Sequence, residues 1–212
     1  MEYLNIERWE RKDHFHFFKD FDDPFFNICA EVDVTETLKF TRERGFSFFL
    51  TTLYLATKAA NKVKEFRYRL HDDKVLVHDR IHPASTVLHE DKSFGFCYFQ
   101  FWEDFSEFYR EAEELLHQFK TEKQPLASQD DKTDVIYYTV LPWMSFTSFK
   151  HAKKFGTKDS IPRIAFGKYA KKEGRMKMPV SVEVHHALVD GIHVGIFLKL
   201  FEVVLLEPQL SL

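Results

Sequence analysis

Apolar residues recur every three to four positions in several stretches of the chain, which is the spacing of one face of an α-helix. On this ground helices are predicted over residues 35–44, 47–65, 103–121 and 191–206. Thr35 can cap the first of these helices and Gly45 can end it, because glycine readily adopts the left-handed conformation that follows a helix.

Six shorter segments are predicted as strands, and the clearest alternation is that of Phe94, Phe96 and Tyr98. The six cover residues 74–79, 86–89, 93–100, 135–141, 162–170 and 175–185. Helices and strands follow one another without strict alternation, which favours an α+β fold. We expect a two-layer sandwich in which a mixed β-sheet carries helices packed on one face.

The composition fits one domain with a sizeable core. Hydrophobic residues make up 44% of the 212 positions, so we expect a single domain over residues 1–212. The 24 phenylalanines exclude a disordered chain, and 7 glycines with 7 prolines exclude a collagen-like or low-complexity one. The polar run at 129–134 is expected to be a loop within this domain.

Nothing in the chain predicts export or membrane insertion. No stretch approaches the roughly 18 apolar residues that a membrane-spanning helix needs. The first residues are charged and lack the apolar centre of a signal peptide. Cys29 and Cys97 are too few for a disulfide framework. We therefore expect a cytoplasmic protein without membrane contact.

Positive charge is concentrated in one part of a chain whose net charge is −3. Residues 150–177 contain ten basic and two acidic side chains. Such a segment is a solvated face, a site for a phosphorylated cofactor or a nucleic-acid surface. Nucleic acid is the weakest of these interpretations, because the rest of the chain is acidic and would repel it.

The motifs of several enzyme classes are absent from the sequence. There is no phosphate-binding P-loop, no glycine-rich dinucleotide fingerprint after a strand and no nucleophile elbow of the G-x-S-x-G type. These absences argue against nucleotide hydrolysis, a Rossmann site and a serine hydrolase.

One segment does combine candidate chemistry with a defined local structure. Alternating valines predict a strand that ends at His185 and His186, and Asp190 with the following glycine turns the chain into the last helix. A histidine held at a strand end suits general-base work near neutral pH. His186, Asp190 and His193 also have spacing compatible with a metal site, although adjacent histidines on a strand point to opposite faces. The remaining alternative is a pair of structural histidines near a turn.

The pattern H-H-A-x-x-D-G-x-H at residues 185–193 resembles that of the chloramphenicol acetyltransferases. The resemblance extends along nearly the whole chain. It includes W-E-R-K-D-H-F at 9–15, D-V-T at 33–35, T-V-L-H at 86–89, L-P-W at 141–143 and G-K-Y at 167–169. The H-H-x-x-x-D-G core alone is less specific, because dihydrolipoyl acyltransferases and peptide-synthetase condensation domains share it.

The resemblance implies a two-layer fold that assembles as a homotrimer with active sites at the subunit interfaces. It implies that His186 is the general base for acetyl transfer from acetyl-CoA to a hydroxyl of a small-molecule acceptor, with no metal. In the family a backbone carbonyl holds the other ring nitrogen of this histidine. Asp190 is implied to pair with Arg11, which orders the turn that carries His186.

Further roles follow from matching positions. Thr139 stands where the family has a serine that stabilises the oxyanion, and Trp143 is expected near both substrates. Lys168 and Tyr169 match positions associated with the phosphates and adenine of CoA, which would explain the basic segment. Phe26 and Phe94 are expected to form aromatic walls of the acceptor site.

Several positions depart from the family pattern at the acceptor site. Phe18 replaces a tyrosine, His151 a leucine, Arg163 an aliphatic residue and Ala165 a threonine; beside the base, Glu183 replaces a glutamine and Ile192 an aromatic residue. A guanidinium in an apolar pocket needs a partner. Arg163 thus indicates a displaced loop, a different and perhaps anionic acceptor, or a side chain that points to solvent.

Four functions are compatible with these features. The first is acetylation of chloramphenicol, which would inactivate the antibiotic, and the second is the same chemistry on another hydroxyl or amine. The third is a non-catalytic trimeric binding protein, and the fourth is nucleic-acid binding through residues 150–177. The set Arg11, His186 and Asp190 favours catalysis, since a scaffold has no need of a base.

Overall fold

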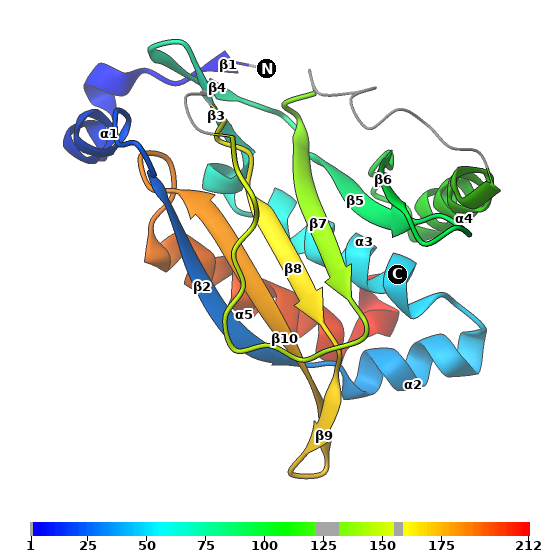
Figure 1. The fold of residues 1–212 in the computed structure, drawn as a ribbon. Helices are drawn as coiled ribbons and strands as arrows, with labels where there is room; N and C mark the ends of the chain where they lie inside the picture. The colour runs from blue at the N-terminus through cyan, green and yellow to red at the C-terminus, as the bar shows by residue number, and fades with distance from the viewer. Residues whose placement is uncertain (1, 122–131, 155–158) are drawn as a thin grey trace.

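A mixed β-sheet forms the centre of the computed structural model, which describes residues 2–121, 132–154 and 159–212. Its strands lie in the spatial order β2 (Phe25–Asp33), β10 (Arg175–His185), β8 (Arg163–Gly167), β7 (Val135–Leu141), β5 (His82–Leu88) and β6 (Phe94–Tyr98), and β9 (Ala170–Lys172) pairs with β10 (Figure 1). Strands β5, β7 and β8 are parallel to one another, and the other pairings are antiparallel.

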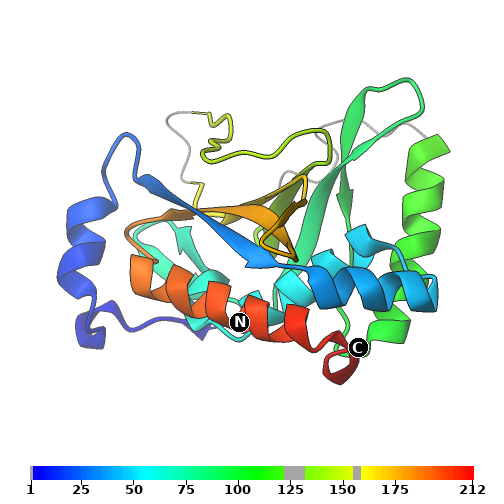
Figure 2. The ribbon, with the colours of Figure 1, turned by 90° about the horizontal axis from the view of Figure 1, so that it is seen from below.

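The helices are distributed unevenly around this sheet. Helices α2 (Thr35–Arg44), α3 (Phe48–Asn61) and α5 (Gly191–Leu206) cover one face, while α1 (Lys12–Phe18) and α4 (Phe105–Thr121) stand at its two ends (Figure 2). The segment 142–154 crosses the opposite face, which we call the open face. The predicted α+β fold, with a mixed sheet and helices packed on one face, is confirmed.

Shorter elements complete the description. A small antiparallel sheet of β1 (Glu2–Tyr3), β4 (Lys74–Val77) and β3 (Tyr68–His71) lies beside the main sheet, and three 3-10 helices cover Ile6–Arg8, Lys64–Arg67 and Pro208–Leu210. Within the described residues, no helix has both the length and the apolarity required to cross a membrane.

Alternation along β10 separates the core from the open face. Val180, Val182 and Val184 are fully buried in the hydrophobic core under the helices, so Ser181 and Glu183 project from the opposite side. The register carries this division across the sheet. Opposite positions are Glu183 with Arg163, Arg163 with Tyr137, Ser181 with Ala165, and Ala165 with Thr139. The open face therefore bears a row of polar side chains.

Two helices account for much of the core. In α5 the residues Val194, Phe197, Phe201 and Leu205 are fully buried, which is the periodic apolar face expected of a helix on a sheet. Helix α3 is buried almost all round, because α2, α4 and α5 pack against it. Burying each such side chain stabilises the fold by about 1.5–3 kcal/mol.

Several predicted boundaries were wrong. The helix predicted over 47–65 ends at Asn61 and is followed by a 3-10 turn, and the strand predicted from residue 86 begins at His82. The segment 162–170 is divided between β8 and β9. Residues 129–131 of the predicted loop lie outside the described residues.

Strand β2 and helix α1 were not predicted from the sequence. The β2 signal was nonetheless present, because Ile28 and Val32 alternate with Asn27 and Glu31. Helix α1 is only seven residues long and buries one side chain, Phe15, so it has almost no periodic signal.

Gly167 allows the segment across the open face to lie close to the sheet. A Cβ atom at this position would lie 2.6 Å from Pro179 Cγ and 2.9 Å from Phe146 Cδ1. Gly167→Ala should therefore destabilise the protein by about 1–3 kcal/mol, the usual cost of overpacking. Denaturant unfolding will measure this. Gly195→Ala on α5 is the control, since a Cβ there meets nothing within 4 Å, and an equal loss in both variants would contradict the prediction.

Candidate active site

His186 lies on a tight turn immediately after β10. Its backbone N–H donates to the carbonyl of Pro24 at 2.8 Å, which ties the turn to the start of β2. Leu188 and Val189 both donate to the carbonyl of His185 at 3.0 Å. The His185 ring accepts a hydrogen bond at Nδ1 from the N–H of Ala187, at 3.2 Å. The turn is thus fixed by its own backbone before any side chain acts on it.

Arg11 binds this turn from the other end of the chain. Its Nε and Nη2 donate to the two carboxylate oxygens of Asp190, at 2.7 and 2.5 Å. The same guanidinium donates to the carbonyls of Ala187 and His186, at 3.1 and 3.0 Å. Burial alone would raise the pKa of Asp190, but the hydrogen bonds and charge of Arg11 outweigh burial and lower that pKa. This is the ion pair that the resemblance implied.

The imidazole of His186 lies between aromatic rings. The Phe18 ring stacks on it with centroids 4.0 Å apart and planes 15° apart, and the Phe26 ring lies 4.6 Å away. Nδ1 is buried and makes no hydrogen bond within the described residues, although Asp190 Oδ1 lies 3.3 Å away. The expected carbonyl partner of Nδ1 is not seen there. The side chain is 35% exposed, which leaves Nε2 as its accessible nitrogen.

His193 takes part in the turn rather than standing free for a metal ion. Its Nδ1 accepts a hydrogen bond from the N–H of Asp190 at 2.9 Å, and its Nε2 lies 3.7 Å from Glu65 Oε1. Among the described residues no group of three or more His, Cys, Asp or Glu side chains is placed to hold a metal ion.

Thr139 lies far from His186 within one chain. It pairs with Ala165 on β8, which pairs with Ser181, five residues before the histidine. At roughly 3.3 Å per residue and roughly 4.8 Å per strand, this places Thr139 about 16 Å along the sheet and about 10 Å across it. One chain therefore brings His186 together with Arg11, Asp190, Phe18 and Phe26, but not with Thr139.

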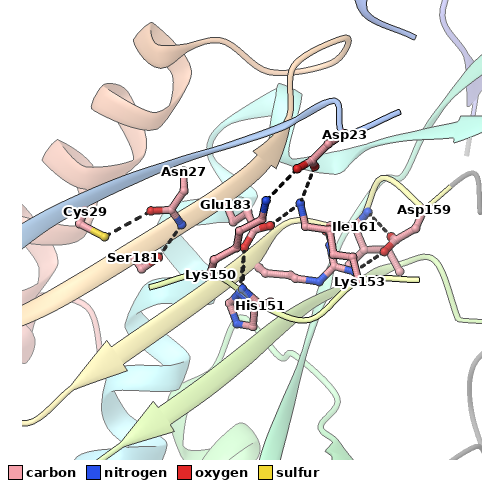
Figure 3. Close-up of polar contacts among 11 residues, drawn as sticks. Asp23, Asn27, Cys29, Lys150, His151, Lys153, Asp159, Ile161, Ser181 and Glu183 are labelled. Carbon is pink, nitrogen blue, oxygen red and sulfur yellow. Dashed lines mark hydrogen bonds and ion pairs between the residues drawn. The ribbon is translucent and has the colours of Figure 1, made fainter. Parts of the chain in front are cut away.

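A network of charged groups covers the open face near the end of β10 (Figure 3). Glu183 is 1% exposed, forms an ion pair with Lys153 and accepts hydrogen bonds from the backbone N–H and the ring of His151, at 3.2 and 3.1 Å. Burial opposes ionisation of Glu183, but these partners lower its pKa to about 2. Asp23 joins the network by pairing with Lys150 and Lys153, at 2.7 and 3.4 Å. Sequence reasoning missed these partners, since nothing in the chain indicated which cations meet Glu183.

Arg163 forms a second pair on the same face. It is 8% exposed and bound to Asp159, with its guanidinium 5.1 Å from the centre of the Phe25 ring. The interpretation that Arg163 points to solvent was therefore wrong. Asp159 neutralises the guanidinium, so the pocket does not need an anionic acceptor to balance it.

The remaining predicted residues lie at the carboxyl ends of β7 and β8. Trp143 is 59% exposed, and the backbone N–H of the exposed Lys168 donates to the carbonyl of Met144 at 2.8 Å. Tyr169 packs edge-on against Phe48, with centroids 5.4 Å apart. Phe94 is 52% exposed at the tip of the β5–β6 hairpin.

The basic segment is largely neutralised within the chain. Six of its cations are paired with carboxylates of the same chain, namely Lys150, Lys153, Arg163, Lys172, Arg175 and Lys177. The excess of charge counted in the sequence is thus no measure of the charge offered to a ligand.

Comparison with known proteins identifies the family. The family described as "Chloramphenicol acetyltransferase" matches residues 1–202. The chain belongs to the chloramphenicol acetyltransferase family. It is an acyltransferase of that family. Relatives include the chloramphenicol acetyltransferase of Proteus mirabilis, 28% identical over 91% of this chain and 88% of the relative, and chloramphenicol acetyltransferase 3 of Escherichia coli, 27% identical over 92% of each.

Solved structures agree with this membership. A chloramphenicol acetyltransferase superposes with a TM-score of 0.90 at 32% identity, over 96% of this chain and 99% of the other. The cubic core of a pyruvate dehydrogenase multienzyme complex matches with a TM-score of 0.66 at 16% identity, over 89% and 84% of the two chains. At that identity the second likeness concerns the fold alone.

Arg11→Gln should lower both stability and activity in this member of the chloramphenicol acetyltransferase family. The change leaves Asp190 and two carbonyls without their donor, and breaking such a pair costs about 3 kcal/mol. Denaturant unfolding and turnover will measure the two effects. Lys39→Gln is the control, because its pair with Glu43 is exposed and 4.0 Å long and contributes less than about 1 kcal/mol. Unchanged unfolding of the Arg11 variant would contradict the prediction.

Proposed function

We propose that this protein transfers the acetyl group of acetyl-CoA to a hydroxyl of chloramphenicol, with His186 as the general base. Family membership supports the reaction. The observation that carries the assignment of the base is the accessible Nε2 of His186 on a turn held by the Arg11–Asp190 pair. We further propose that the 212 residues act as one domain, in the cytoplasm where acetyl-CoA is available.

In the proposed reaction both substrates are bound together and no acyl-enzyme forms. Nε2 of His186 takes the proton from the acceptor hydroxyl as its oxygen attacks the thioester carbonyl. The tetrahedral intermediate then collapses, the carbon–sulfur bond breaks, and the CoA thiolate leaves and recovers the proton from the imidazolium. The rings of Phe18 and Phe26 fix the imidazole plane, which favours a single direction of attack.

The oxyanion of that intermediate requires a donor, for which we propose the hydroxyl of Thr139. Its separation of about 16 Å along and about 10 Å across the sheet from His186 supports an active site made by two copies of the chain. We accordingly propose a homotrimer in which His186 of one subunit faces Thr139 of the next. Trp143 would lie near both substrates there, and Lys168 and Tyr169 would contact CoA.

The acceptor is the part of the proposal with a specific alternative. Phe18 covers His186 without a hydroxyl, and His151 and Arg163 place polar groups on the open face. These features favour, as the second candidate function, the same acetyl transfer to another hydroxyl or amine.

His186→Ala should abolish acetyl transfer and leave the fold intact. Free CoA thiol will be measured with purified protein, acetyl-CoA and chloramphenicol, and removal of the base should reduce turnover at least about 100-fold. Drug-dependent release by the unaltered protein would support both donor and acceptor. Near-normal turnover by the variant would refute the role of His186, and no release by the unaltered protein would direct the search to other acceptors.

Two inactive variants should restore activity together if the site lies between subunits. His186→Ala and Thr139→Ala, unfolded together and refolded as a mixture, would form some interfaces with an intact histidine and an intact threonine. The mixture should then turn over faster than the sum of the separately refolded variants. Equal rates would contradict the shared site, and sedimentation will report the oligomeric state in parallel.

A further inference from the structure

His151 is held over the open face by a buried carboxylate. Its side chain is 12% exposed, and Glu183 Oε2 lies 3.1 Å from Nδ1 and 3.2 Å from the backbone nitrogen. The ring also packs edge-on against Phe149, with centroids 4.7 Å apart. Two hydrogen bonds and one aromatic contact therefore fix the ring plane.

This bond determines which nitrogen of the imidazole carries the proton. An ionised carboxylate only accepts hydrogen bonds, so Nδ1 of His151 must donate to Glu183. In the neutral imidazole Nε2 then has a lone pair and no proton. That Nε2 atom is buried and has no hydrogen-bond partner within the described residues. A buried polar atom left unpaired costs free energy, so its partner is to be sought outside this chain.

The charges around His151 are already balanced. Glu183 pairs with Lys153, and Arg163 pairs with Asp159. Asn27 donates to Ser181 at 2.6 Å on the neighbouring positions of β2 and β10. The open face as described thus offers no uncompensated charge to select an ion, but it does offer one unused lone pair.

This lone pair lies on the side of the sheet that carries Thr139. Glu183 is opposite Arg163, which is opposite Tyr137, and Thr139 follows two residues later on the same face of β7. Figure 3 shows the His151 ring on this face, beside the stacked pairs of Glu183 and Lys153. An acceptor held near Thr139 would therefore be within reach of this part of the face.

We propose that His151 is a specificity-determining residue whose Nε2 accepts a hydrogen bond from the acceptor molecule. The acceptor then carries an O–H or N–H group in addition to the group that is acetylated. This inference rests on the proposed acetyl transfer and names the class of acceptor that the site prefers. Glu183 is the positioning residue that fixes the ring and its proton.

The test compares matched acceptors on matched variants. The probes are chloramphenicol, its analogue with the non-acetylated hydroxyl replaced by hydrogen, and its analogue with the amide nitrogen methylated. We expect the unaltered protein to lose at least tenfold in kcat/KM with one of the two analogues, because the lone pair of Nε2 is then unpaired. In His151→Leu the same analogue and chloramphenicol should be used about equally, with the KM for acetyl-CoA unchanged.

Two further variants protect this comparison. His14→Leu makes the same change at an exposed position of α1 and should keep the preference of the unaltered protein. His151→Gln keeps a donor for Glu183 but removes the outer nitrogen, and it replaces the leucine variant if that variant does not fold.

The outcomes separate the inference from the proposed function. Turnover with the same ratio of kcat/KM values in the unaltered protein and in His151→Leu would overturn the role of His151 and leave acetyl transfer standing. A preference that persists in His151→Gln would also overturn it. Absence of CoA release with all three probes would overturn the proposed acceptor, and this inference would fall with it.

Discussion

The fork between Arg11 and Asp190 is the interaction on which the arrangement of the site depends. It joins residues 179 positions apart, and the same guanidinium also binds two carbonyls of the turn that carries His186. Four hydrogen bonds to one planar cation fix a segment that strand geometry alone would leave free after β10. The N-terminal part of the chain is thus a structural support for the C-terminal turn. Helix α1 then places Phe18 against the imidazole from the same support.

The open face depends on a second constraint, the balance of buried charge. Glu183, Lys153, Arg163 and Asp159 would each be costly alone among the rings of Phe25 and Tyr137, and each has a partner of opposite sign. The Lys153 ammonium additionally lies 3.8 Å from the centre of the Phe25 ring. The departures at Glu183 and His151, which look unrelated in the sequence, are one connected feature. They hold the crossing segment in place with ionic pairs.

The sequence was most informative where a periodic pattern and a resemblance coincided. The strand ending at His185, the final helix and the Arg11–Asp190 pair were all predicted, because valine alternation and the histidine motif are local signals. Partners that depend on tertiary contact were not predictable. Asp159 is four residues from Arg163, yet only the folded loop shows that it neutralises the guanidinium. The count of ten cations between 150 and 177 likewise could not show that six of them are paired within the chain.

The geometry of the sheet explains why a site of this kind is divided. General-base chemistry needs a rigid turn with an accessible nitrogen, which the end of β10 provides, while the oxyanion needs a donor on a strand edge, which β7 provides. These places are separated by two strand spacings and about five residues of rise, too far for one substrate carbonyl to reach both. Under the proposed trimer, a neighbouring copy closes that distance without any deformation of the sheet. The acceptor then lies between one subunit's aromatic wall and the other's polar face, where the ring of His151 is already fixed in a single orientation.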